Sequence, residues 1–168
     1  MRQKKNLFFF LFVSVFILIG QETNLQDAEQ KIRTLAKQIL NSESDSLKKI
    51  ANNELTDYLL EIIQYKKAYK YPFNSIEHIS VLQPKKKEFK IFTWFIPYLN
   101  GTFEYHGIIQ ICNKRGKKCK TYQIQKNLKL SQQDLYNELS FNNWYGCLYY
   151  DIIPIKIKKE IYYTLLGW

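Results

Sequence analysis

The sequence predicts an α+β fold in which two N-terminal helices pack on a five-stranded antiparallel β-meander, with a short helix before the fourth strand. Three observations lead to this prediction. Apolar residues recur at helical spacing over residues 24–66, and from residue 89 the apolar residues alternate with a period of two. Between two of the alternating runs stands Asn100-Gly101, a strong local signal for a β-hairpin.

The first helix is expected over residues 24–41, with Asn24 as its N-cap and Asp27 in its first turn. A second helix is expected from about 46 to 66, after the break "SESD". Its apolar stripe comprises Leu47, Ile50, Ala51, Leu55, Leu59, Ile62 and Ile63. Such stripes indicate helices that pack onto their own domain.

The strands follow Pro72, which disfavours helix in the residue before it. The runs "FKIFTWFIPYL", "TFEYHGIIQIC" and "KTYQIQ" are the first three predicted strands. Residues 130–139 are the predicted short helix, capped by Ser131, and the last two strands are expected within 144–155 and 160–168.

A two-residue turn at Asn100-Gly101 would place Trp94 opposite Gly107 and make one face of the hairpin wholly apolar. A register slipped by one would place Trp94 opposite His106, and the apolar pattern argues against it. Pro97 is a difficulty for the favoured register, because it would need to donate an N–H in its pair with Glu104.

Three cysteines are present: Cys112, Cys119 and Cys147. Pairing Cys112 with Cys119 also sorts apolar from polar residues across the second and third strands, with Ile109 opposite Tyr122. The sequence therefore predicts a Cys112–Cys119 disulfide. The spacing is that of neither a zinc site nor a thioredoxin-like redox motif, so no metal or other cofactor is expected. Cys147 is interpreted as a small core residue.

The N-terminus indicates export. Residues 1–20 combine a basic start, "MRQKK", with the apolar run "LFFFLFVSVFILIG". As a helix this run would span roughly 21 Å, short of the roughly 30 Å bilayer core. We therefore expect a signal peptide over 1–20, cleaved near Gly20, and a single domain over 21–168 that is periplasmic, at the cell surface or secreted. An uncleaved anchor is the alternative.

The chain is basic, with 25 Lys and Arg against 15 Asp and Glu and a formal net charge of +10. The basic residues are scattered, which suits a compositional bias more than a dedicated patch. Two basic turns stand out, "PKKK" at 84–87 and "NKRGKK" at 113–118. Such turns can contact anionic glycans or phosphates but are usually only solvated. Export argues against a nucleic-acid partner.

One sheet face is expected to stay free of the helices and to carry a mixture of polar and aromatic side chains. Amide groups beside an aromatic plane suit a polar or anionic glycan. The candidate ligand-binding residues are Phe95, Glu104, His106, Gln110, Gln123 and Gln125. The alternative interpretation is a solvated sheet face. His106 and Glu104 also raise a hydrolase hypothesis, but no nucleophile motif accompanies them.

Two stretches, "YPFNSIEHISVLQPKKKEFKIFTWFIPYLNGTFEYHGIIQI" and "WYGCLYYDIIPIKIKKEIYYTLLGW", resemble a family of exported bacterial proteins of unknown function. The words "FTW", "NGTFEYHG", "WYG" and "YYTLLGW" carry the resemblance, which covers about Tyr71 to Trp168. It implies export, and it supplies no catalytic residues and no ligand. It also implies further chain beyond the "LLGW" segment.

The last two predicted strands are apolar on both faces, and such strands need cover on both sides. We therefore expect exposed apolar surface around Tyr162, Leu165 and Trp168, covered by a further subunit or further chain. The favoured function is a non-enzymatic binding or structural module of the cell envelope or secreted space. The alternative is a hydrolase, or the scaffold of one, that uses His106 and Glu104.

Overall fold

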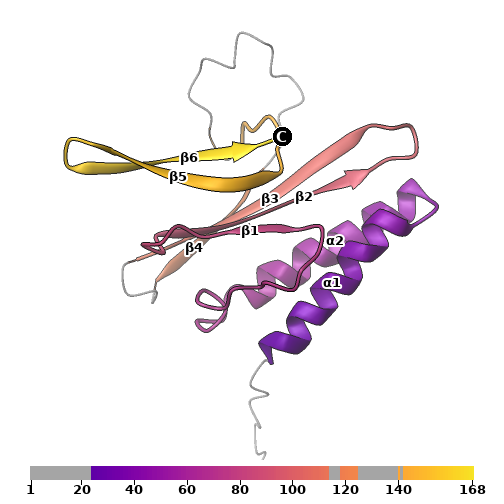
Figure 1. The fold of residues 1–168 in the computed structure, drawn as a ribbon. Coiled ribbons are helices and arrows are strands. Elements are labelled where there is room, and N and C mark those ends of the chain that lie inside the picture. The colour runs from indigo at the N-terminus through magenta and orange to yellow at the C-terminus, as the bar shows by residue number, and fades with distance from the viewer. Residues whose placement is uncertain (1–23, 114–117, 125–139, 141) are drawn as a thin grey trace, which may run out of the picture.

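A computed structural model describes residues 24–113, 118–124, 140 and 142–168, and it confirms the α+β class with two N-terminal helices and antiparallel strands. The helices and strands of the described residues are α1 (Leu25–Asn41), α2 (Asp45–Ile62), β1 (Ser80–Leu82), β2 (Phe89–Pro97), β3 (Phe103–Cys112), β4 (Cys119–Ile124), β5 (Tyr149–Ile157) and β6 (Glu160–Gly167). Strands β1 to β4 form one sheet in chain order, the main sheet, and β5 pairs with β6 in a second sheet (Figure 1).

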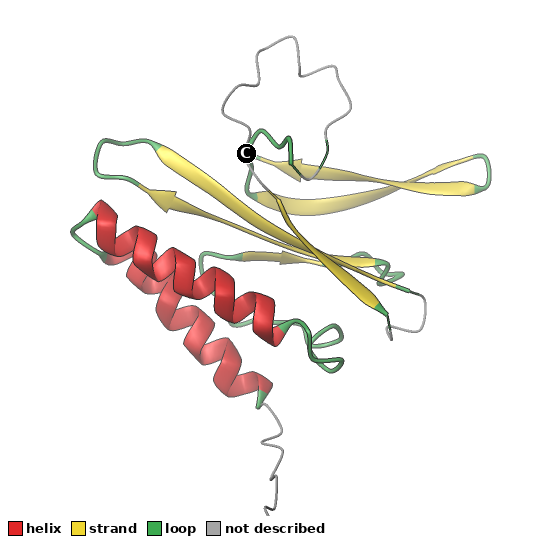
Figure 2. Cartoon of the chain, turned by 180° about the vertical axis from the view of Figure 1, so that it is seen from behind, coloured by secondary structure: helices red, strands yellow, loops and turns green. Residues whose placement is uncertain are grey.

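The described residues form three layers. Both helices lie on one side of the main sheet, and the β5–β6 hairpin crosses its other side (Figures 1 and 2). Two apolar clusters fill the spaces between the layers. The larger joins α1 and α2 to β2 and β3 through residues such as Ile32, Leu55 and Trp94. The smaller, around Ile91, Ile124 and Trp144, lies between the main sheet and the hairpin.

Helix α1 forms where the sequence predicts it. The Asn24 side chain accepts a hydrogen bond from the Gln26 N–H at 3.1 Å, which satisfies a backbone donor that the first turn leaves free. The apolar side of α1 is buried at Ala28, Ile32, Leu35, Ala36 and Ile39.

Helix α2 begins close to its predicted start but buries a narrower stripe than expected. Leu47 and Ile50 are 55% and 62% exposed. Ile50 is five residues from the fully buried Leu55, about 140° around the helix at 3.6 residues per turn, and so faces solvent. Lys48 is buried instead, and its ammonium donates to the Pro97 carbonyl oxygen at 2.6 Å.

The prediction of a five-stranded meander is wrong. The main sheet has four strands, including the short β1 that the pattern did not predict, and the last two strands form a separate hairpin. The physical reason is that β2 is apolar on both faces and therefore requires cover on both sides. The helices cover one face and the β5–β6 hairpin covers the other. The predicted short helix at 130–139 lies outside the described residues.

The predicted register of β2 against β3 is also wrong, by one residue. Trp94 pairs with His106, and Ile96 pairs with Glu104. The turn has three residues, because the Tyr98 N–H donates to the Thr102 carbonyl at 2.9 Å. Gly101 has a φ of 82° and supplies the left-handed residue that such a loop needs.

The new register also removes the difficulty at Pro97. The Tyr98–Thr102 pair beside it is hydrogen-bonded, and Pro97 pairs with Phe103. Hydrogen-bonded and non-hydrogen-bonded pairs alternate along an antiparallel ladder. Pro97–Phe103 is therefore a non-hydrogen-bonded pair, in which Pro97 does not need to donate an N–H to β3.

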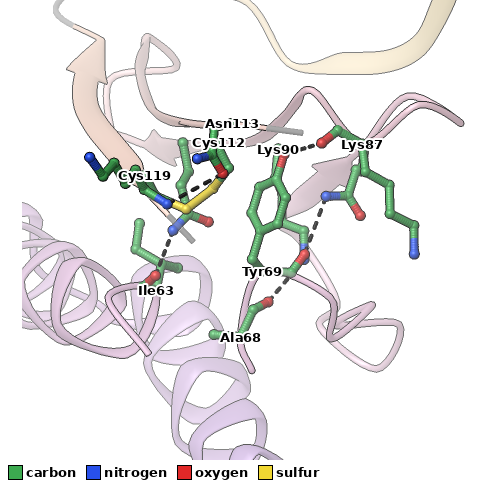
Figure 3. The surroundings of a disulfide bond; sticks show 11 residues. Ile63, Ala68, Tyr69, Lys87, Lys90, Cys112, Asn113 and Cys119 are labelled. Atoms are coloured by element: carbon green, nitrogen blue, oxygen red, sulfur yellow. Dashed lines mark hydrogen bonds between the residues drawn. A yellow bond between two sulfur atoms is a disulfide. The ribbon is translucent and has the colours of Figure 1, made fainter. Parts of the chain in front are cut away.

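The predicted register of β3 against β4 is confirmed, and so is the disulfide. Ile109 pairs with Tyr122 and Cys112 pairs with Cys119. A bond joins Cys112 and Cys119, whose Cα atoms are 4.1 Å apart. Figure 3 shows the bond close to Ile63, just after the end of α2.

The connection between α2 and β1 is held by two buried charged residues. Glu29 of α1 accepts hydrogen bonds from the Ser75 N–H and the Tyr71 hydroxyl, both at 2.6 Å. From the opposite side, the Lys90 ammonium donates to the carbonyl oxygens of Ala68 at 3.1 Å and Tyr71 at 2.5 Å (Figure 3 labels Ala68 and Lys90). This connection is thus fixed to both a helix and the main sheet.

The β5–β6 hairpin is attached to the main sheet at its open end and near its middle. The Tyr149 N–H donates to the Thr93 hydroxyl at 3.1 Å, and the Tyr163 ring packs edge-on against Phe89 with centroids 5.2 Å apart. The outward face of the hairpin is apolar and exposed. Its large exposed residues are Ile153, Ile155, Ile157 and Tyr162, with Tyr150 and Trp168 stacked beside them.

Candidate functional site

The structure does not assemble the predicted ligand-binding face. The one-residue register change places Glu104, His106 and Gln110 beside the buried side of β2, toward the helices. Phe95 lies on the opposite face, against the rings of Phe103 and Tyr105. Gln123 shares the helix side of the sheet but is exposed, and Gln125 lies outside the described residues.

Glu104 and His106 do lie together. Glu104 Oε1 is 3.2 Å from His106 Nε2, and the Tyr98 hydroxyl donates to the other carboxylate oxygen. The geometry at His106 Nε2 is too poor for a hydrogen bond, and this nitrogen has no other partner among the described residues. Burial therefore prevails over the nearby carboxylate and lowers the pKa of His106, so that the imidazole is neutral at pH 7.

The surroundings of this pair are those of a packed hairpin end. The His106 ring stacks on Trp94, with ring centroids 5.8 Å apart. Trp94 is hydrogen-bonded to Asn52 of α2, and Asp45 of α2 accepts from the Leu99 N–H at 3.0 Å. Neither Glu104 nor His106 lines either of the two larger cavities described below. The bonds of Trp94 and Leu99 to α2 hold this end of the β2–β3 hairpin on the helix.

Gln110 is buried at the other end of α2. Its amide nitrogen donates to the Ile63 carbonyl oxygen at 2.6 Å, which satisfies one of the carbonyls that a helix end leaves free. That bond fixes the orientation of the amide, and its oxygen has no partner among the described residues. Gln110 lines a polar cavity of about 460 Å³ together with Ile63, Gln64, Tyr65, Lys66, Tyr69, Cys119 and Thr121.

A larger cavity lies elsewhere, between the two sheets. It has a volume of about 630 Å³ and is mainly apolar. One wall is the segment 82–86, where β1 ends and the connection to β2 begins, and the other is the β5–β6 hairpin. The hairpin residues that line this groove are Asp151, Ile152, Pro154, Ile161 and Tyr163.

The groove follows from two local features. On the first wall, β1 ends after three residues, and Pro84 to Lys87 form a tight turn closed by a 2.8 Å bond from the Lys87 N–H to the Pro84 carbonyl. On the second wall, the inward side of the hairpin carries Ile152 and Ile161, one on each side of the Pro154–Tyr163 pair along the strands. The Tyr163 hydroxyl donates to Glu88, which raises the pKa of Tyr163 to about 12 and keeps it neutral.

The rim of the groove is basic. Lys85 and Lys86 occupy the two central positions of the Pro84–Lys87 turn and are exposed, and neither forms an ion pair within the described part of the chain. Asp151 is the one acidic residue among those that line the groove, and its carboxylate accepts the Ile152 N–H at 2.7 Å.

Sequence reasoning identified the basic turn 84–87 but not the groove. The turn carried a visible signal, the run of lysines after Pro84. Its partner wall comes from residues 151–163, far away in the sequence, and no pattern linked the two segments. The Cys147 thiol is half-buried and its pKa is raised by burial, which agrees with a packing role and disfavours a nucleophile.

The described residues contain no cluster of three or more metal-ligating side chains, and none of their helices is long and apolar enough to cross a bilayer. Fold and site together define a disulfide-bonded α+β protein with an apolar groove between two antiparallel sheets. Comparisons with protein-family models, with curated proteins and with solved structures found no match.

Proposed function

We propose that this protein is an exported, non-enzymatic binding module that takes an apolar ligand into the groove between its two sheets. The observation that carries the proposal is the cavity of about 630 Å³ with its apolar walls. Small-molecule sites commonly have volumes of 300 to 1,000 Å³ and a mainly hydrophobic lining with few polar groups. The groove has both properties.

Export is supported by the sequence of residues 1–20 and by the disulfide, since such bonds persist in oxidising compartments. The resemblance of residues 71–168 to exported proteins of unknown function points the same way. Mass spectrometry of the native protein tests this part of the proposal. We expect an N-terminus at or near Gln21, and an intact N-terminus on membrane-bound protein would instead establish an anchor.

The competing hypothesis, a hydrolase that uses His106 and Glu104, rests on the 3.2 Å contact between them. A general base must reach the group whose proton it takes. His106 is only 17% exposed and packs against Trp94, which leaves little room for a substrate. Assays of the protein and of His106→Ala against ester and glycoside substrates decide between the two functions, and we expect no His106-dependent turnover.

Binding in the groove is tested with a neutral apolar fluorophore such as phenylnaphthylamine. We expect saturable binding to the native protein. The variant Ile161→Trp puts a larger side chain into the groove and should abolish binding. Its matched control is Ile157→Trp on the outward face of the same hairpin, where the native residue is 53% exposed, and this variant should bind normally. Equal binding by both variants would refute the groove as the site.

A further inference from the structure

We infer that the ligand of the groove is an amphiphile with an alkyl chain and an anionic head, of the chemical class of long-chain carboxylates and monoalkyl phosphates. The inference rests on the proposed function, because it uses the same groove, but it adds the identity of the head group and its place. The chain would lie between the two sheets, and the head would lie at Lys85 and Lys86.

The walls of the groove suit an alkyl chain. Leu82 and Pro84 line one side, and Ile152, Pro154 and Ile161 line the other. Pro84 is buried, so the wall of the groove beside the turn is shielded from water at this residue. An alkyl chain in this space would have apolar area removed from water on both of its sides, which favours binding.

The polar groups beside the chain are largely occupied. The Gln83 amide nitrogen donates to the Tyr69 carbonyl oxygen at 3.2 Å, and the Tyr163 hydroxyl is bound to Glu88. A polyhydroxyl ligand would therefore find few free partners deep in the groove. This distribution favours an apolar chain over a saccharide there.

The rim supplies the charge that an anionic head requires. The turn from Pro84 to Lys87 presents Lys85 and Lys86 next to each other at the open side of the groove, and neither ammonium forms an ion pair with a described residue. Two neighbouring ammonium groups repel each other, and an anion between them relieves that repulsion. Asp151, on the facing wall, offsets one of the two positive charges and leaves the rim net positive.

The same arrangement disfavours ligands with cationic or neutral head groups. A quaternary ammonium at the rim would meet two like charges, and a neutral hydroxyl would gain only a hydrogen bond. Exposed charge pairs contribute roughly 0.2–1 kcal/mol each. Two such contacts correspond to roughly a two- to thirtyfold preference for an anionic head over a neutral one of the same chain length.

The experiment is competition against bound phenylnaphthylamine at low salt, below the critical micelle concentration of each competitor. The competitors are dodecanoate, dodecyl phosphate, dodecanol, dodecyltrimethylammonium and butanoate. We expect dodecanoate and dodecyl phosphate to compete several-fold better than dodecanol, with the cation weakest and butanoate inactive. The stronger of the two anions identifies the head group. The preference should shrink as salt is added, because exposed charges are screened.

Two double variants locate the head. Lys85→Gln/Lys86→Gln should remove the preference for dodecanoate over dodecanol, chiefly by lowering the affinity for dodecanoate. The control, Lys158→Gln/Lys159→Gln, removes the same charge from the exposed tip of the β5–β6 hairpin and should keep the preference. Equal loss in both double variants would show an effect of net charge alone and would overturn the inference.

Failure of the inference and failure of the proposed function are distinguishable. If dodecanol competes as well as dodecanoate, and Ile161→Trp still abolishes binding, the groove binds apolar ligands but the anionic head is wrong. If no competitor displaces the fluorophore, or Ile161→Trp binds it normally, then both are wrong. Circular dichroism of each variant verifies that the fold is intact.

Discussion

The indole N–H of Trp94 donates to the amide oxygen of Asn52 across 2.7 Å, and both side chains are buried. This bond joins the central strand β2 to the middle of α2. Because the Trp94 ring also stacks on His106, the bond helps to position the residue that the hydrolase hypothesis depends on.

The variant Asn52→Ala tests this bond. It leaves the buried indole N–H without a partner, and an unsatisfied buried donor costs about 1–3 kcal/mol. We expect the free energy of unfolding, measured with urea, to fall by that amount. The control Asn53→Ala changes the exposed neighbour on the same helix and should change stability by less than about 0.5 kcal/mol. Similar losses in the two variants would contradict the role of the bond.

Lys90 is expected to make stability rise with pH above about 8. Burial, with a smaller contribution from Lys87, lowers the pKa of Lys90 to about 8 from its usual 10.5. Between these values the unfolded chain binds the proton that the folded protein has released. Stability due to this group therefore increases with pH, by at most about 1.4 kcal/mol per pH unit.

Urea unfolding of the native protein and of Lys90→Met between pH 8 and pH 10 measures this rise. The variant should be less stable overall, because the Ala68 and Tyr71 carbonyls lose their donor, but it should lack the rise. The comparison stops at pH 10, since above it the raised pKa values of tyrosines such as Tyr71 act in the opposite direction. The same pH profile in both proteins would rule out the lowered pKa of Lys90.

The Cys112–Cys119 disulfide closes a short loop, and removing it should destabilise the protein by about 2–3 kcal/mol on the chain-entropy account. Unfolding of Cys112→Ser/Cys119→Ser provides the measurement. Cys147→Ser is the matched control, because Cys147 is not bonded to another cysteine. Non-reducing peptide mapping of the native protein should recover Cys112 and Cys119 in one linked pair. Alkylation of all three thiols without prior reduction would disprove the bond.

Gly101 and Gly146 both have positive φ, at 82° and 86°, but their surroundings differ. A Cβ at Gly101 meets nothing within 4 Å, whereas one at Gly146 lies 3.0 Å from the Tyr105 side chain. Gly101→Ala should therefore cost about 1–2 kcal/mol, the penalty for a left-handed backbone, and Gly146→Ala should cost more. Gly101→Asn should recover part of the loss, since asparagine tolerates this conformation. Thermal unfolding of the three variants checks the order.

The outward face of the β5–β6 hairpin is expected to cause self-association of a protein that comprises residues 21–168. Tyr162 and Trp168 are exposed, as predicted, while Leu165 is half-buried against the smaller apolar cluster. In sedimentation velocity, the sedimentation coefficient should rise with protein concentration. The double variant Ile155→Thr/Tyr162→Thr should reduce this rise. The variant Lys156→Gln is the control. A monomer at every concentration would disprove the expected association.

The two hairpins of the main sheet show how much of the strand register can be predicted from the sequence. For β3 and β4, two independent constraints, the cysteine pair and the sorting of apolar residues, select the same register, and the prediction is correct. For β2 and β3, Asn100-Gly101 fits either a two-residue turn or a three-residue loop with Gly101 in the left-handed region. Every residue of β2 is buried or half-buried, on whichever face of the sheet it lies, so the pattern of the strand cannot choose between the two registers.

The candidate site was harder to predict for a related reason. A hydrophobic pattern reveals that residues 144–168 are apolar on both faces, but not which sheet they join. The predicted meander added these strands to the edge, whereas the structure lays them across the open face. The groove and its basic rim exist only in the second arrangement, because residues 82–86 and 151–163 meet there alone.

The double attachment of the α2–β1 connection has a consequence for its motions. The Ser75 amide is bound to the buried Glu29, and the carbonyls of Ala68 and Tyr71 are bound to Lys90. Although the connection contains no helix or strand, it cannot open locally without breaking contacts to α1 and β2. We therefore expect the Ser75 amide to exchange its hydrogen with solvent nearly as slowly as amides in the centre of β2, through global unfolding only.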